Sequence, residues 1–247
     1  MGRTKTRTTA PAGTDLAEHV TTMVLRTFDA ADLLRRRVES LFDALGRPAV
    51  SADLAAVAPD VTGMLGGLIT GAGVITTPLA DGRHGVEWWM GTTPGPTRLA
   101  LDVDPESDDF AAVGRQQWFT VPRDTGRRHV TGPYVDYVCA EQYTLTFTVP
   151  ILRDGRFAGV TGADVFVGDI ERILRPALRA VGAPVVLVNK QGRIVAGTTA
   201  HHITGSLIRE PHIRAALLAG VPQTLPDGVA VAPCRDDLPL AVLTWTR

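Results

Sequence analysis

Apolar residues recur at intervals of three and four along residues 15–45. This spacing places them on one face of a helix and predicts one long helix over this range. Asp15 with Glu18 three positions later forms a capping-box pattern, and Gly46 and Pro48 provide a stop. A helix of this length is a rod of about 45 Å, which either lies along a sheet or pairs with its own copy in a dimer. The apolar positions are Leu16, Val20, Met23, Val24, Phe28, Ala31, Leu34, Val38, Leu41, Phe42 and Leu45.

The pattern then changes from helical spacing to short apolar runs. A second, shorter helix is predicted from Ser51, with an interruption at Pro59 and an end at Gly66 and Gly67. Runs separated by Gly, Pro and Asp predict strands at residues 73–77, 86–90, 98–103, 134–138, 143–152 and 157–167. A further helix begins near Asp169. Helices followed by mostly antiparallel strands indicate an α+β fold, with the long N-terminal helix packed on an antiparallel sheet.

Beyond Gly182 a similar set of predicted strands and a helix is repeated on a smaller scale. The expected elements are a hairpin of residues 185–188 and 193–196, a helix at 206–218, and strands near Val229 and at 240–246. They predict a smaller second α+β lobe. The predicted organisation is a disordered N-terminus at 1–14, a first domain at 15–182 and the second lobe at 183–247.

One hairpin allows a register to be predicted. The strand at residues 144–149 alternates threonine with an apolar residue, so Leu145 lies on an apolar face. Asp154 and Gly155 suit a two-residue turn with positive φ at both positions. If the residues flanking this turn pair, Asp164 on the next strand lies opposite Leu145 and shares its apolar face.

A carboxylate on an apolar face needs a partner. In one interpretation Asp164 caps backbone amides near the helix at Asp169 or meets an arginine. In the other it binds a cationic group of a ligand. Gly159 and Gly162 favour the ligand, because glycine in a strand often leaves room for a close approach.

Aromatic residues surround the segment upstream of this hairpin. Trp118-Phe119 and Tyr134-Val135-Asp136-Tyr137 bracket a polar stretch rich in Gly and Pro, residues 120–133, which is predicted to be a loop. Such rings either belong to the core or, together with a carboxylate, form a cage for an ammonium group.

Trp88 and Trp89 lie side by side on a predicted strand. Adjacent side chains of a strand point to opposite faces. One indole can therefore line a cavity while the other lies at an interface, or both can belong to the core.

Composition and charge exclude several classes of function. The chain has 247 residues, 25 basic and 26 acidic side chains, a net charge of -1 and a pI of about 6.6. With this net charge, the chain has no overall electrostatic attraction to nucleic acid or to anionic lipid. No apolar run of about 20 residues and no secretory signal are apparent, so we expect no membrane segment and a cytoplasmic location. Cys139 and Cys234 are too few for a disulfide framework or a four-thiolate zinc site.

Enzyme motifs are mostly missing. The chain has no G-x-S-x-G elbow, Walker loop or H-E-x-x-H motif. His201, His202 and His212 lack the spacing and fourth ligand of a metal site, so neither a metal nor a cofactor is expected. Cys139 lies near His129 and acidic residues in sequence, which permits a thiolate-and-base arrangement.

Four motifs carry a resemblance to a known family. They are Trp118-Phe119, Gly132-Pro133-Tyr134-Val135-Asp136, Phe147-Thr148-Val149-Pro150-Ile151, and Asp154-Gly155-Arg156-Phe157-Ala158-Gly159-Val160-Thr161-Gly162-Ala163-Asp164. In their order they resemble the Cache superfamily, the PAS-like extracellular sensor domains of bacterial receptors. The segment at 185–196 looks like the second module of double-Cache proteins. The resemblance implies a PAS-like sheet in the first domain and a small-molecule pocket on it.

The resemblance also implies a set of pocket residues. In amino-acid-sensing members a Trp-aromatic pair, a later Tyr and an Asp at the end of the last long strand line the pocket. The Asp holds the ligand ammonium, and an Arg two residues before the Trp holds the ligand carboxylate. Here Gln116 stands at that Arg position, with Arg115 adjacent, so the amine half of the site carries over better than the carboxylate half. The expected ligand-binding residues are Trp118, Phe119, Tyr134, Asp136, Asp164, Arg115, Gln116 and Trp89.

The expected function is reversible binding of an amino acid, amine or similar small molecule by a sensor, without turnover. One alternative is a small hydrolase or lyase that uses Cys139 or a histidine in the same cleft. Another is an assembly module that dimerises through the long helix. A homodimer through this helix and a separate regulatory protein are the expected macromolecular partners.

Overall fold

The computed structural model describes residues 13–136, 142–235 and 238–245. The chain divides into two compact units. The larger unit runs from Thr22 to Ile170, and the smaller unit combines the residues before Thr22 with those after Ile170. Helices α1 (Thr14–Ala44) and α5 (Val167–Ala180) each contribute to both. The predicted boundary at residue 182 and the role of each lobe stay predictions.

The long N-terminal helix is confirmed as α1. In the larger unit its inner face carries buried apolar residues, with Phe28 and Val38 fully enclosed. Its outer face carries the exposed side chains of Arg26, Asp29, Leu33 and Arg36. That face is thus mostly polar, and pairing of α1 with its own copy stays a prediction.

The larger unit is built on a six-stranded antiparallel sheet with the order β3-β2-β1-β6-β5-β4. The strands are β1 (Gly71–Pro78), β2 (His84–Met90), β3 (Thr97–Arg98), β4 (His129–Asp136), β5 (Gln142–Arg153) and β6 (Arg156–Phe166). The short third strand replaces the longer one expected at 98–103.

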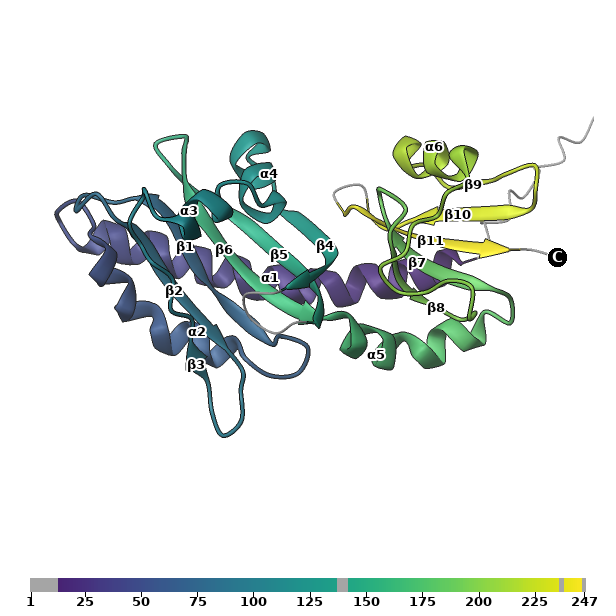
Figure 1. Cartoon of the computed structure of the whole chain (residues 1–247), viewed down its shortest axis with the longest axis horizontal. Coiled ribbons are helices and arrows are strands. Elements are labelled where there is room, and N and C mark those ends of the chain that lie inside the picture. The colour runs from purple at the N-terminus through teal and green to yellow at the C-terminus, as the bar shows by residue number, and fades with distance from the viewer. Residues whose placement is uncertain (1–12, 137–141, 236–237, 246–247) are drawn as a thin grey trace, which may run out of the picture. The chain divides into compact units, whose positions relative to one another are not determined.

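Helices cover both faces of this sheet (Figure 1). On one face α1, the 3-10 helix η1 (Ser51–Val57) and α2 (Ala58–Met64) pack on strands β1 and β5. On the other face lie α3 (Asp108–Val113) and α4 (Gln117–Thr125), whose buried Phe110, Val113 and Phe119 join the core around Trp88. The architecture confirms the predicted α+β fold with a long helix on an antiparallel sheet.

The smaller unit has a five-stranded antiparallel sheet with the order β8-β7-β11-β10-β9. The strands are β7 (Val185–Asn189), β8 (Ile194–Gly197), β9 (Gln223–Thr224), β10 (Val229–Pro233) and β11 (Leu240–Trp245). Helix α6 (Pro211–Ala219) contributes Ile213, Ala216 and Leu217 to its core. The predicted hairpin is present, and the Asn189 side chain closes its turn by accepting hydrogen bonds from the N–H groups of Gln191 and Arg193.

Cys234 is buried in the smaller unit. Burial raises the pKa of its thiol to about 12. Because the thiolate is the reactive form, we expect this thiol to resist Ellman's reagent at pH 8 in the folded protein and to react in 6 M guanidinium. A Cys139→Ser background isolates the measurement, and fast reaction of the folded variant would contradict the burial.

The segment expected as a loop at 120–133 contains the last six residues of helix α4 and the start of β4. Pro122 and Gly126 favour a loop locally, yet Phe119 and Pro122 are buried on one side of α4. Packing of this side on the sheet outweighs the weak local propensity. Gly126, with φ of 64°, then ends the helix in the left-handed conformation.

The predicted turn is present, but the predicted register is wrong by one residue. Asp154 and Gly155 have φ values of 49° and 75°, and Arg153 pairs with Arg156 as expected. A bulge then interrupts the ladder, because Leu152 pairs with Phe157 whereas Ile151 pairs with Gly159. The extra residue exchanges the faces of everything beyond it on β6.

The bulge decides where Asp164 points. Asp164 pairs with Thr146 instead of Leu145, so it lies on the threonine face. The apolar face is turned toward α1, where the Phe147 ring meets Phe28 edge to face at 5.4 Å. Asp164 therefore shares the opposite face with α3 and α4.

Candidate functional site

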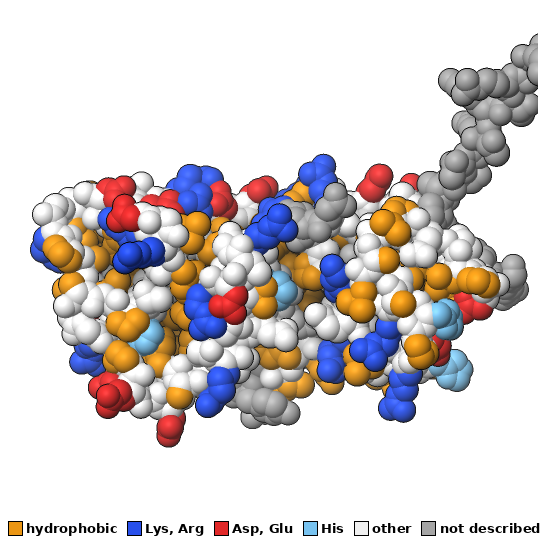
Figure 2. Space-filling model, turned by 90° about the horizontal axis from the view of Figure 1, so that it is seen from above, with side chains coloured by type: hydrophobic (Ala, Val, Ile, Leu, Met, Phe, Trp, Pro, Cys, Tyr) orange, Lys and Arg blue, Asp and Glu red, His pale blue; other side chains and the backbone are white. Residues whose placement is uncertain are grey.

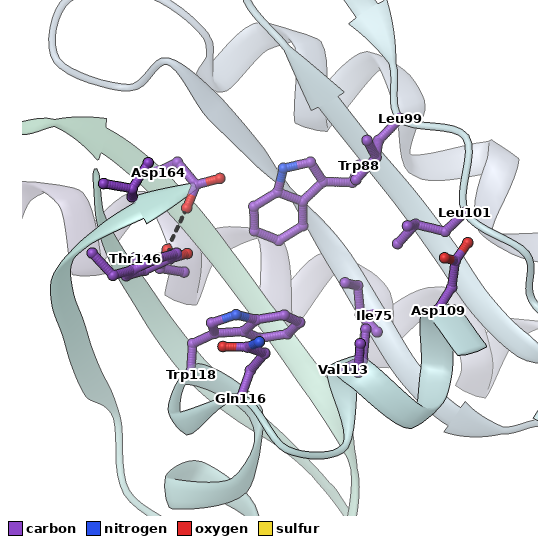
Figure 3. Close-up of a pocket in the computed structure, with 13 residues that line it drawn as sticks. Ile75, Trp88, Leu99, Leu101, Asp109, Val113, Gln116, Trp118, Thr146 and Asp164 are labelled. Atoms are coloured by element: carbon purple, nitrogen blue, oxygen red, sulfur yellow. Dashed lines mark hydrogen bonds between the residues drawn. The ribbon is translucent and has the colours of Figure 1, made fainter. Parts of the chain in front are cut away.

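A cavity of about 380 Å³ lies between the sheet and helices α3 and α4 of the larger unit. Its walls are largely apolar, and Trp88 and Trp118 lie on two sides of it (Figure 3). This volume is in the range of small-molecule sites. The lining residues are Ile75, Trp88, Leu99, Leu101, Asp109, Ala112, Val113, Gln116, Trp118, Tyr134, Val135, Thr146 and Asp164.

Glycines on the central strands make room for the Trp88 indole. Gly73 pairs with Trp88 across β1 and β2, and a Cβ on Gly73 would lie 2.6 Å from the Trp88 Cα. A Cβ on Gly162 would lie 3.2 Å from the far edge of the same indole. The large ring can therefore lie close to the sheet because these positions have no side chain.

A row of polar groups borders the cavity at β4, β5 and β6. The Thr146 hydroxyl donates to Asp164 Oδ1 at 2.6 Å, and the Tyr134 hydroxyl lies 2.7 Å from the Thr146 oxygen. Since Thr146 has one proton and gives it to Asp164, Tyr134 is the donor in the second bond. Asp164 is only 4% exposed, so its carboxylate is held in a largely desolvated wall.

A second acidic residue lies at the other end of the cavity (Figure 3). Asp109 is in the first turn of α3, which Ser107 caps by accepting from the Phe110 N–H. Its Oδ2 accepts the Asp102 N–H at 2.8 Å. Among the cavity-lining residues that the structure describes there is no Lys, Arg or His, so the charged groups of this site are acidic.

The structure brings together four of the predicted site residues. Trp118, Tyr134, Asp164 and Gln116 all line the cavity. Their roles in binding stay predictions.

Three other predicted residues lie elsewhere. Phe119 is buried in the core and packs on Phe157 at 5.2 Å. Arg115 is exposed and does not line the cavity. Trp89 lies on the opposite face of the sheet, against the core of α1, η1 and α2. The side chain of Asp136 lies outside the described residues, as does Cys139.

Sequence reasoning missed Asp109, and it named Trp89 instead of Trp88 as a ligand-binding residue. The alternation of side chains along the strands indicates which indole faces the cavity. Trp88 pairs with Gly73, and Gly73 lies two residues from Gly71, which pairs with Asp164. Residues paired directly across strands share a face. Asp109 gave no comparable signal, because α3 was not predicted.

Glu87 is a buried carboxylate on the face away from the cavity. It is 1% exposed, accepts from Trp89 Nε1 at 2.6 Å and pairs with Arg98 Nη2 at 2.9 Å. Glu87→Ala is expected to lower the free energy of unfolding by about 2 kcal/mol, since it leaves the partly buried Trp89 indole N–H without its acceptor and removes the carboxylate that pairs with Arg98. Chemical denaturation measures this loss.

Asp124→Ala is the control for Glu87→Ala. It removes a carboxylate whose pair with Arg123 is exposed on both sides, and such pairs contribute about 0.5 kcal/mol or less. Equal losses for the two variants would contradict a structural role of Glu87.

The histidines considered in the sequence as metal ligands are not arranged as a metal site. His212 pairs with Asp227 at 2.7 Å, and His202 stacks on Trp245 at 4.6 Å. In the part of the chain that the structure describes, no three His, Cys, Asp or Glu side chains are arranged to hold a metal. None of the described helices has the length and hydropathy needed to cross a bilayer.

The outer surface carries charges of both signs. On the face seen in Figure 2, basic and acidic side chains are interspersed with hydrophobic ones. This agrees with the near balance of 25 basic and 26 acidic residues in the sequence.

In fold, the chain resembles sensor domains of the Cache type, also called PDC. Residues 97–172 match the model of the first PDC sensor domain of methyl-accepting chemotaxis-like proteins. The match includes α3, α4 and β4 to β6, which supply most of the polar residues of the cavity. The resemblance to Cache sensor domains is confirmed.

One curated relative is similar in sequence over part of the chain. The methyl-accepting chemotaxis protein TlpQ of Pseudomonas aeruginosa strain PAO1 is 26% identical over 91 residues. The match covers 35% of this chain and 13% of TlpQ.

Solved sensor domains share the fold over nearly the whole chain. The extracellular domain of mmHK1S-Z3, assigned as a histidine kinase, has a TM-score of 0.71 and 15% identity, covering 94% of this chain and 90% of that one. The Campylobacter jejuni Tlp3 sensory domain with isoleucine has a TM-score of 0.53 and 19% identity, covering 94% and 89%. The Pseudomonas aeruginosa PctC domain with GABA has a TM-score of 0.54 and 17% identity, covering 92% and 94%.

These relatives bear on two earlier expectations. They are sensor domains and not enzymes. The mmHK1S-Z3 domain is extracellular, so nothing among the relatives favours the cytoplasmic location expected from sequence, which stays a prediction.

Proposed function

We propose that the larger unit binds a small organic molecule with a protonated amino group, reversibly and without turnover, and that Asp164 accepts this group. The observation that carries the proposal is the position of Asp164, a 4% exposed carboxylate in the wall of an aromatic cavity. Binding of this molecule would be the signal that the sensor detects.

The chemistry of the wall suits a cation. A carboxylate has room for about four hydrogen bonds, so Asp164 can accept an ammonium group alongside the Thr146 hydroxyl. Charge-assisted hydrogen bonds are stronger than neutral ones, and a dry site strengthens them further. The faces of Trp88 and Trp118 add cation–π attraction for the same group.

The ligands of the relatives agree with an amine-binding site. Isoleucine in Tlp3 and GABA in PctC both carry an amino group and a carboxyl group. In this chain Gln116 lines the cavity and Arg115 does not, so a neutral amide is what a ligand carboxylate would meet. An amine without a carboxylate is therefore favoured over an amino acid.

A thermal-shift screen tests the proposal. The panel consists of primary amines, the corresponding alcohols of the same shape, and amino acids, followed by calorimetry and by mass spectrometry of the recovered ligand. We expect amines to raise the melting temperature and to be recovered unaltered, and the alcohols to have little effect. Binding of alcohols and amines with equal affinity would contradict the proposal, and conversion of the ligand would favour an enzyme.

A further inference from the structure

One wall of the cavity belongs to a segment at the edge of the sheet. Leu99 and Leu101 line the cavity just beyond β3, beside Trp88 (Figure 3). Strand β3 itself has only two residues. Beyond it the Leu99 N–H donates to the Trp88 carbonyl oxygen at 2.8 Å, and the His84 N–H donates to the Val103 carbonyl oxygen at 2.9 Å. The backbone therefore joins this wall to β2 at widely spaced points.

An ion pair fastens this segment from the opposite face of the sheet. Arg98 pairs directly with Trp89 across β3 and β2, so both side chains lie on the face away from the cavity. There Arg98 Nε and Nη2 donate to Glu87 Oε2 at 3.1 and 2.9 Å, and Nη2 also donates to the Val86 carbonyl oxygen at 2.9 Å. Because adjacent side chains of a strand point to opposite faces, the residue after Arg98 is a cavity-lining leucine.

Glu87 is the fixed end of the pair. Its side chain is buried, and its Oε1 accepts the Trp89 indole N–H at 2.6 Å. It lies on β2, which is hydrogen-bonded to β1 on its other side. Arg98 is on the edge strand, and its side chain is 54% exposed. Because a buried carboxylate that loses its cation is costly, the pair favours the position of β3 in which Arg98 reaches Glu87.

We propose that Arg98 and Glu87 are positioning residues, which hold the Leu99 and Leu101 wall in place from the far side of the sheet. The effect on binding rests on the proposed function, which supplies a ligand that these two residues do not touch. Without the pair, the segment separates from β2 more often, and a bound amine loses its packing on the two leucines. The amine is then released faster, while the rate at which it enters the cavity stays the same.

Native-state hydrogen exchange of the full chain tests this restraint without a ligand. Arg98→Met keeps a long unbranched side chain and removes the guanidinium. We expect the amide protons of Leu99 and His84 to exchange about tenfold faster in this variant, the scale of a lost charge-assisted bond. The amide protons of the central strand β6 should keep their rates. Arg98→Lys should be intermediate, since one ammonium group restores the charge without the planar fork of donors.

The release of an amine tests the effect on the site. In stopped-flow measurements with n-hexylamine, Arg98→Met should raise the dissociation rate constant by about fivefold or more and leave the association rate constant within about twofold. Arg37→Met is the matched control, because it removes an arginine from an ion pair with Asp60, between α1 and α2 of the same unit. This control should leave both rate constants and the exchange of the Leu99 amide unchanged.

The two measurements separate this proposal from the proposed function. An Arg98→Met protein whose Leu99 amide exchanges as slowly as in the Arg37→Met protein overturns the restraint, whether or not amines bind. Faster exchange with unchanged release of n-hexylamine overturns the positioning role, while amine binding at Asp164 stands. Failure of n-hexylamine and every other primary amine to bind overturns the proposed function, and the exchange rates alone then decide whether the pair holds the cavity wall.

Discussion

Asp164→Asn is expected to weaken the binding of a primary amine by a factor of about ten to one hundred. The substitution keeps the shape of the side chain and an oxygen that can accept from Thr146, but it removes the charge that faces the ligand. A charge-assisted hydrogen bond in a desolvated site contributes about 1.5 to 3 kcal/mol, which corresponds to this range of affinity. Isothermal titration calorimetry with the best amine of the panel measures the change.

Asp154→Asn is the control for this prediction. It removes the same charge from an exposed turn, where Asn also tolerates the positive φ of 49°. Its affinity should equal that of the unmodified chain. If Asp164→Asn binds every amine as tightly as Asp154→Asn does, Asp164 is not the ammonium acceptor.

Gly159→Ala is expected to destabilise the larger unit by about 3 kcal/mol or more. The residue has a φ of 148°, which L side chains rarely adopt, and an added Cβ would lie 2.4 Å from the Ile75 carbonyl oxygen on the neighbouring strand. Strain of this kind costs about 1 to 3 kcal/mol, and overpacking of a core adds a similar amount. Chemical denaturation monitored by far-UV circular dichroism measures the loss.

The matched variant is Gly168→Ala. Gly168 lies in α5 with nothing within 4 Å of an added Cβ, and alanine is the better helix former by up to about 1 kcal/mol. This variant should be as stable as the unmodified chain or slightly more so. A Gly159→Ala protein with the stability of Gly168→Ala would contradict the bulge geometry on which the orientation of Asp164 depends.

The long helix and most strands of the larger unit could be predicted because their patterns are local. Spacings of three and four define α1, and alternation defines β5. The turn at Asp154 and Gly155 follows from residue types that accept positive φ.

The bulge could not be predicted, because its cause lies on another strand. Gly159 is noticeable in sequence, but it is the Ile75 carbonyl of β1, pressed against it, that requires a residue without a side chain. Because of the register error, Asp164 was predicted on the correct strand but on the wrong face of the sheet. A register argument that counts from a turn fails at the first bulge.

The candidate site was predictable where a motif carried it and not where packing built it. Trp118, Tyr134 and Asp164 came from the resemblance to Cache domains, and all three line the cavity. No motif pointed to Asp109, and the six-residue helix α3 that carries it is too short to give a periodic signal in the sequence.

The most direct measurement is a crystal structure of the protein with a bound primary amine. We predict the amine nitrogen within about 3.2 Å of an Asp164 carboxylate oxygen, in the cavity bordered by Trp88 and Trp118. An amine bound outside this cavity, or one inside it whose nitrogen points away from Asp164, would contradict the account.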